Sequence, residues 1–350
     1  MFQRIALLSC ALVMAACSSD GDDGPKTDAE YKQSVIKGMH DTLGKDVQAL
    51  HAAAVALQKA APAESRGWSD EDTAAIEATT NEWLKARSAY ERSEGAIAPL
   101  FAEIDAAIDA RYDDFLESLA PDGDADLFDG EGVTGMHAIE RILFAKSIPA
   151  SVVEVESTLD GYVPARWPEN GTEAQQFKTE LCQKLVDDTA LLVTEWTPTR
   201  IDVQGAFGGL IALMNEQREK VNKAASAEEE SRYAQRTLAD IRDNLAGTRK
   251  AYELFRPWIN SKDGGAEIDA SIEAAFDELD QAYSSLPGDA FPPLPPDFSA
   301  ENPSAANLET EFGALFNRVQ EAADPNRAGS VVNGMNQAAV LLNFPEFVEE

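Results

Sequence analysis

The sequence predicts an all-α protein built from two pseudo-repeated antiparallel helical bundles that pack as one unit. Long stretches rich in Ala, Glu, Leu, Lys and Gln carry apolar residues at three- and four-residue steps, as at Val47, Leu50, Ala54 and Leu57. That spacing places the apolar side chains on one face of a helix. Runs that alternate apolar and polar residues, as strands do, are almost absent, and prolines and glycines separate the periodic stretches.

The N-terminus is typical of a lipoprotein signal peptide over residues 1–16. Arg4 precedes an apolar run that ends in Ala15 and Ala16, directly before Cys17. The run of about a dozen residues is too short to cross a bilayer as a helix. We therefore expect cleavage before Cys17, a lipid on that cysteine and an acidic tether over residues 17–28. This predicts a lipid-anchored protein of the cell envelope, on a periplasmic or surface face. Ser18 favours the outer membrane if the source is Gram-negative.

The helical domain is expected over residues 29–345, with halves at about 29–160 and 172–345. Pro99 and Pro198 are expected to end helices, and 121–132 and the proline-rich 287–303 are expected to be connecting segments. A faint repeat pairs Arg87 to Glu91 with Arg249 to Glu253 and suggests duplicated halves. The periodicity predicts helices over 30–61, 71–96, 99–118, 134–145, 150–160, 172–196, 204–225, 228–259, 266–285, 305–323 and 328–341.

The composition of the chain limits the kinds of molecule that the protein could bind. The chain has a formal net charge of −33 and 44% hydrophobic residues. Such acidity makes nucleic acid and anionic lipid surfaces poor partners and favours cations or a basic partner protein. Of three cysteines, Cys10 leaves with the signal peptide and Cys17 carries the lipid, so Cys182 alone remains. A disulfide within the mature chain is therefore excluded, and a large apolar core must stabilise it.

The best lead to a chemical site is the segment from Gly135 to Glu140. His137 and Glu140 are three residues apart, so a helix would place both side chains on one face. The chain has only three histidines. A zinc-peptidase His-Glu-x-x-His motif and the nucleotide-binding glycine motifs are absent.

Two acidic helix segments could complete a metal site with this pair. Glu91 and Glu94 share a helix face, and Asp109 lies one turn after Asp105 on the next helix. Helical bundles build metal sites from carboxylates and histidines of different helices. Four carboxylates and one imidazole would need a multivalent cation, with iron, manganese or calcium suiting such ligands. The alternative for each acid pair is a solvated helix face.

These segments resemble the imelysin-like family, which includes EfeO-type periplasmic components of iron uptake. The resemblance rests on Gly135-x-His137-x-x-Glu140, on the segment from Ala86 to Glu94 followed by 108–111, and on the segment 231–247. It implies two pseudo-repeated bundles and a metal site, with His137 and Glu140 as motif ligands. It implies Glu91, Glu94 and Asp109 as their partners, and a divalent or trivalent ion, iron above zinc, manganese or calcium.

The sequence is compatible with three functions. The first is a lipid-anchored protein that captures iron or another divalent cation, free or chelated, and passes it to an importer. The second is a metallopeptidase, which needs an open metal position and a base that activates water. Glu140 could be that base only if it is not a ligand. The third is an envelope scaffold or adhesion lipoprotein in which the motif only caps a helix. This scaffold function would be disfavoured if the side chains of Glu91, Glu94 and Asp109 converge on His137, and favoured if they point away from it.

Overall fold

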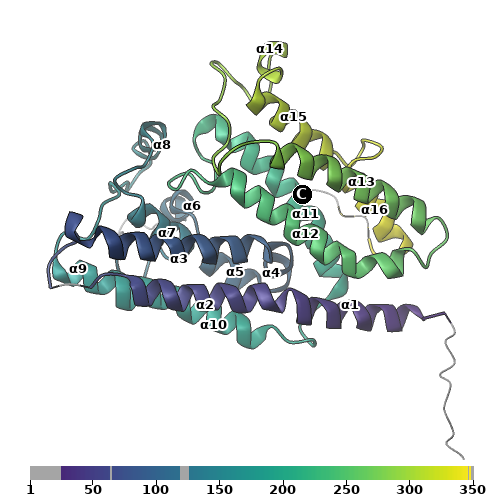
Figure 1. Ribbon diagram of the computed structural model, residues 1–350, viewed down its shortest axis with the longest axis horizontal. Helices are drawn as coiled ribbons and strands as arrows, with labels where there is room; N and C mark the ends of the chain where they lie inside the picture. Colours follow the sequence, from purple (N-terminus) through teal and green to yellow (C-terminus); the bar gives the residue numbers. More distant parts are fainter. Residues whose placement is uncertain (1–24, 64, 119–125, 346, 348–350) are drawn as a thin grey trace, which may run out of the picture.

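A computed structural model describes residues 25–63, 65–118, 126–345 and 347 of the chain (Figure 1). The signal peptide, Cys17 and the tether up to residue 24 lie outside the described residues. Within the described part the structure is helical, with one isolated bridge between Arg66 and Asn170 and no strand. This confirms the predicted all-α fold. No described helix is both long and apolar enough to span a membrane.

The first layer contains the N-terminal helices together with α10 (Figure 1). α1 begins with a capping box. The Thr27 side chain accepts a hydrogen bond from the backbone N–H of Glu30, and the Glu30 side chain accepts one from the backbone N–H of Thr27. Two N–H groups at the start of the helix are thereby satisfied. The single helix predicted over 30–61 is two helices, with Leu43 between them. The helices of this region are α1 (Asp28–Thr42), α2 (Gly44–Ala60), η1 (Asp70–Asp72), α3 (Thr73–Glu91), α4 (Glu94–Leu100), α5 (Ala102–Asp109), α6 (Tyr112–Ser118), α7 (Gly135–Leu143) and α8 (Ala150–Glu156).

The second layer is built around α11 and α12, with α13, α15 and α16 packed on their far side (Figure 1). α12 also packs against α1 and α3, so it joins the two layers. The remaining helices are α9 (Gly171–Gln176), the π-helical turn η2 (Phe177–Leu181), α10 (Cys182–Glu195), α11 (Val203–Lys223), η3 (Ala224–Ser226), α12 (Thr237–Ile259), α13 (Gly265–Ser284), α14 (Ala305–Leu308), α15 (Glu311–Ala323) and α16 (Val331–Leu341).

Three further features differ from the sequence expectations. The helix predicted over 228–259 begins only at Thr237, because residues 227–236 form turns with Ala227 and Gln235 at positive φ. Pro99 lies inside α4 and does not end a helix. α10, expected in the second half, packs against α2 and α5 of the first. The pseudo-repeat itself stays a prediction.

Candidate metal centre

The position of α7 is set by its first residue, Gly135. This glycine has φ +86°, in the left-handed region, and a Cβ there would lie 2.6 Å from the backbone oxygen of Ile108. Only glycine permits both the backbone conformation and such close approach. The Trp83 indole donates to the Met136 carbonyl at 2.9 Å and ties α7 to α3. The start of α7 therefore lies against the end of α5, where Asp109 follows Ile108.

Glu140 holds the ring of His137 from behind. Its Oε1 accepts hydrogen bonds from the backbone N–H groups of Tyr233 and Ala234, at 3.1 and 2.8 Å. Its Oε2 lies 2.8 Å from Nδ1 of His137. Since an ionised carboxylate can only accept, Nδ1 keeps the proton whenever the ring is neutral, and Nε2 is then the nitrogen with the free lone pair. Glu140 is thus fully engaged as the group that orients the imidazole.

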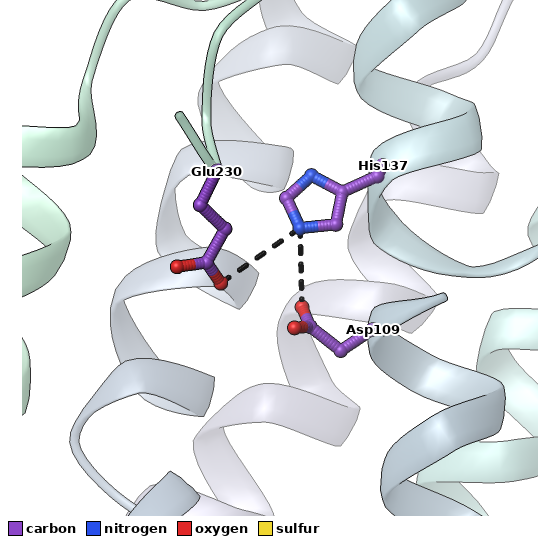
Figure 2. A group of neighbouring side chains, drawn as sticks. All are labelled: Asp109, His137 and Glu230. Atoms are coloured by element: carbon purple, nitrogen blue, oxygen red, sulfur yellow. Dashed lines mark ion pairs between the residues drawn. The ribbon is translucent and has the colours of Figure 1, made fainter. Parts of the chain in front are cut away.

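Nε2 of His137 faces two carboxylates from other parts of the chain (Figure 2). It lies 3.4 Å from Oδ1 of Asp109 and 3.9 Å from Oε1 of Glu230. His137 is 1% exposed, and among the described residues no group makes a well-aligned hydrogen bond with Nε2. Ligand atoms from these three residues all lie within 4.8 Å of one another. An imidazole nitrogen and two carboxylates at this spacing are a donor set for a borderline or hard metal ion.

The guanidinium of Arg87 pairs with the same two carboxylate atoms. It contacts Asp109 Oδ1 and Glu230 Oε1 through its two terminal nitrogens, and it also pairs with Glu91. Arg87 is fully buried, and its Nε lies 3.5 Å from Asp240. A buried guanidinium is tolerated where acids compensate it. Arg87 is therefore the internal counter-ion of the acids that face His137.

A second internal cation, Lys220, lies on the other side of Glu230. Its ammonium is within 2.6 Å of Glu230 Oε2 and 2.9 Å of the Asn244 side-chain oxygen. Glu91 and Glu216 follow at 3.2 Å and Glu94 at 3.5 Å. Glu230 thus uses one oxygen toward His137 and Arg87 and the other toward Lys220. The carboxylate of Glu230 joins the two parts of the acidic cluster.

Burial and charge shift the pKa values of these groups strongly. Burial alone would lower the pKa of His137, but the Asp109 carboxylate raises it well above its ordinary value. Burial raises the pKa of Glu91 and of Glu94, although Arg87 lowers the first and Lys220 the second. Burial would also raise the pKa of Glu230, yet Arg87 and Lys220 hold it well below its usual range. A metal ion would therefore displace a proton from the ring.

The predicted site residues all lie in this region, with Asp109 half-buried and the others buried, but they have different neighbours. Asp109 and His137 face each other, and Glu140 lies behind the ring. Glu91 and Glu94 line the Lys220 side of the cluster, where the Asn244 amide donates to both. The sequence reasoning missed further members of the cluster. These are Arg87, Glu216, Lys220, Glu230 and Asp240.

Part of the missing set could have been found. Arg87 and Asp240 lie inside the segments that carry the family resemblance, and Glu230 directly precedes Ser231. Glu230 was missed because the triplet Glu228 to Glu230 fell inside the helix predicted over 228–259, which gave no sign that Glu230 faces His137. Lys220 gave no signal, since a lysine on an amphipathic helix ordinarily faces water.

Comparison with known proteins supports the family assignment. The model of the Imelysin family, Peptidase_M75, matches residues 36–323. An Efem/EfeO family lipoprotein of Staphylococcus haemolyticus is 28% identical over 81% of this chain and 86% of its own length. The iron uptake system component EfeO of Escherichia coli is 29% identical over 55% of this chain, which is 40% of EfeO.

A solved structure supports the fold. An imelysin-like protein from Psychrobacter arcticum superposes with a TM-score of 0.63 over 92% of this chain and 98% of its own, at 12% identity. Since the family model covers most of the chain, and the fold agrees, this chain belongs to the imelysin family.

Proposed function

We propose that this protein is a metal-binding component of an iron uptake system, and that it holds iron between Asp109, His137 and Glu230. The observation that carries the proposal is the buried Nε2 of His137, which faces two carboxylates while Glu140 fixes the opposite nitrogen. A histidine whose second nitrogen is held by a carboxylate is the usual arrangement of a metal ligand. Glu140 is accordingly a positioning residue in this proposal, and Glu91 and Glu94 lie near Glu230 on the Lys220 side of the cluster.

Two lines support iron as the cargo. The relatives named above are an iron uptake component and a lipoprotein of the same named family. A set of oxygens with a single imidazole nitrogen suits iron or manganese better than copper or a thiolate-bound zinc. Iron as Fe²⁺ or Fe³⁺ is therefore the first choice, with manganese, zinc and calcium as competitors.

The geometry favours binding over peptide hydrolysis. A metallopeptidase needs a base beside the metal-bound water. Both oxygens of Glu140 are taken up, one by two backbone N–H groups and the other by His137. The scaffold alternative is disfavoured because Asp109 faces His137, and Glu91 and Glu94 lie in the same acidic cluster on its Lys220 side.

We further propose that a lipid on Cys17 anchors the protein to a membrane of the envelope, the outer membrane favoured, and that it hands its ion to an importer. The lipoprotein name of the S. haemolyticus relative supports the anchor. Detergent phase partitioning tests it, because Cys17→Ser should move the protein into the aqueous phase. Retention of the variant in the detergent phase would refute a Cys17 anchor.

Calorimetric titration of the full chain tests the metal site. Ferrous iron under anaerobic conditions, ferric iron, manganese, zinc and calcium are each titrated into the wild type and His137→Ala. The matched control is His40→Ala, which alters a more exposed histidine on α1 whose ring pairs with Asp41. We expect saturable binding in the wild type and the control, and its loss in His137→Ala. Equal binding by all three proteins would refute the assigned site.

A further inference from the structure

A cavity of about 350 Å³ lies between α4 and α11, next to the acidic cluster. Its walls are small or apolar and include Gly95, Ala98, Gly208 and Phe347. Pro99 and Ala212 line it and are exposed, whereas Glu94 lines it and is 3% exposed. The cavity therefore runs from the surface to a buried carboxylate.

Small residues let α4 and α11 approach each other closely along this cavity. α4 and α11 approach so closely that a Cβ on Gly209 would lie 2.0 Å from the Gly95 carbonyl oxygen. The ring of Phe347 closes one side, 2.5 Å from where a Cβ of Gly208 would lie. Phe347 is fixed there by two hydrogen bonds between its backbone and the Asn336 side chain. The six waters of a hydrated divalent ion occupy about 180 Å³ of liquid volume, so the cavity can admit such an ion whole.

The inner end of the cavity connects with the metal centre through a row of oxygens. Glu94 and Glu216 line the cavity, and both contact the Lys220 ammonium. That ammonium contacts Oε2 of Glu230, whose Oε1 faces His137. Lys220 therefore shows that a cation is stable between these acids. The cluster places cation-binding oxygens continuously from the cavity to the proposed ligands.

The residues that line the cavity also favour a hydrated metal cation over a metal bound to an anionic chelator. Glu94 and Glu216 are the only ionisable side chains that line the cavity within the described chain. Carboxylate oxygens accept hydrogen bonds from the waters of a hydrated cation. An anionic chelate finds no lysine or arginine along the walls, and burying its charge there without a partner is costly.

We propose that the metal reaches the buried centre through the α4–α11 cavity as a hydrated cation, with Glu216 as its first protein contact and no anionic chelator accompanying it. This inference rests on the proposed metal site. The arriving charge takes the place of the Lys220 ammonium among the acids, and the flexible lysine side chain permits that displacement.

Stopped-flow binding of Mn²⁺ to the full chain, followed with a competing indicator dye, tests the route. Ala212→Phe places a large ring at the exposed rim of the cavity, and Gln204→Phe adds the same ring at an exposed position of α11 outside it. We expect Ala212→Phe to slow association about tenfold or more while the equilibrium affinity stays close to the wild type. Gln204→Phe should bind at the wild-type rate.

Two variants that each remove one negative charge give an independent test if Ala212→Phe does not fold. Glu216→Gln should also slow association, whereas Glu219→Gln, which removes the same charge from an exposed site on the same helix, should not. Equal association rates in the wild type and both cavity variants would overturn the route. Absence of Mn²⁺ binding by the wild type would instead overturn the proposed metal site.

The form of the metal is tested by offering manganese with increasing citrate. We expect the association rate to follow the concentration of free Mn²⁺. A rate that follows the manganese–citrate complex would overturn the inference that the ion travels without an anionic chelator.

Discussion

At the scale of single residues, the two nitrogens of His137 have different tasks. Nδ1 faces Glu140 and Nε2 faces Asp109 and Glu230. The helical spacing of His137 and Glu140 correctly predicted that their side chains meet. Spacing alone could not show which nitrogen Glu140 contacts, because that depends on backbone N–H groups donated by Tyr233 and Ala234 from a distant turn.

Glu140→Gln should weaken metal binding about 10- to 100-fold, a usual cost of losing a group that orients a ligand. The two backbone donors will retain the amide oxygen, so the amide NH₂ must face Nδ1. That donor reverses the ring tautomer and puts the proton on Nε2, where a metal ligand needs a lone pair. Titration calorimetry measures the change, with Glu154→Gln at an exposed position of α8 as the control. Undiminished affinity in Glu140→Gln would contradict the positioning role.

Arg87 competes with a metal ion for Asp109 and Glu230, so its removal should make stability dependent on metal. Arg87→Met should lower the free energy of unfolding by about 3–5 kcal/mol without metal, because it leaves buried acids uncompensated. Saturating Mn²⁺ should recover more stability in this variant than in the wild type. Urea unfolding with and without Mn²⁺ measures both effects.

The matched control for this change is Arg249→Met. Arg249 occupies the corresponding position of the faint repeat, but its side chain is 28% exposed and pairs with Glu273 and Asp277. Its loss should cost about 1 kcal/mol or less. If Arg87→Met folds but no longer binds metal, Arg87 holds the ligands in place and does not compete for them.

At the scale of elements, the junction between α5 and α7 decides whether the ligands meet. Gly135→Ala should remove metal binding and destabilise the protein, since its Cβ would lie 2.6 Å from the Ile108 oxygen. Gly288→Ala is the control, because Gly288 also has positive φ, +73°, but nothing lies within 4 Å of its Cβ position. Gly288→Ala should cost only the left-handed strain, about 1 kcal/mol, and keep metal binding. Thermal unfolding measures the loss of stability in each variant, and calorimetry measures metal binding. Equal losses in Gly135→Ala and Gly288→Ala would contradict the claim that the close approach of Gly135 to Ile108 positions the ligands.

The pairing of α12 with α13 should depend on pH through Asp269. Burial alone would raise the pKa of Asp269, but Arg256, Asn260 and Tyr252 together hold it below its ordinary value of 3.8. A depressed pKa in the folded state stabilises the protein above the unfolded pKa and loses that effect as pH falls.

Asp269→Asn should therefore lower the free energy of unfolding by about 1–3 kcal/mol near pH 7. The difference from the wild type should narrow as the pH falls below about 4. Urea unfolding across this pH range measures it, with Asp280→Asn, exposed on the same helix, as the control. A difference that grows toward low pH would contradict the assigned sign.

Most helices were predictable because each carries its own apolar face. The exceptions have local causes. Residues 228–236 resemble a helix in composition, yet Ala227 and Gln235 adopt positive φ and the segment folds into turns. Pro99 is tolerated inside α4 although it has no N–H to donate to the carbonyl of Gly95, four residues earlier. That carbonyl faces Gly209 of α11 instead.

At the scale of the whole molecule, the acidic composition favours cations as ligands, although many of the acids lie on exposed helix faces. Helix periodicity could not predict which helices become neighbours. Glu230 and Asp109 are separated by 121 positions of sequence, as their residue numbers show, and only the packing of the two layers brings them together. The sequence therefore predicted the fold class and the meeting of Asp109 and Glu140 with His137, whereas Glu230 comes from the turn before α12.

Anomalous diffraction from crystals of the full chain grown with manganese tests the metal centre most directly. We predict a single strong peak about 2 Å from Nε2 of His137, within reach of Asp109 and Glu230. A peak elsewhere in the molecule at saturating manganese, or none at all, would contradict the metal centre assigned here.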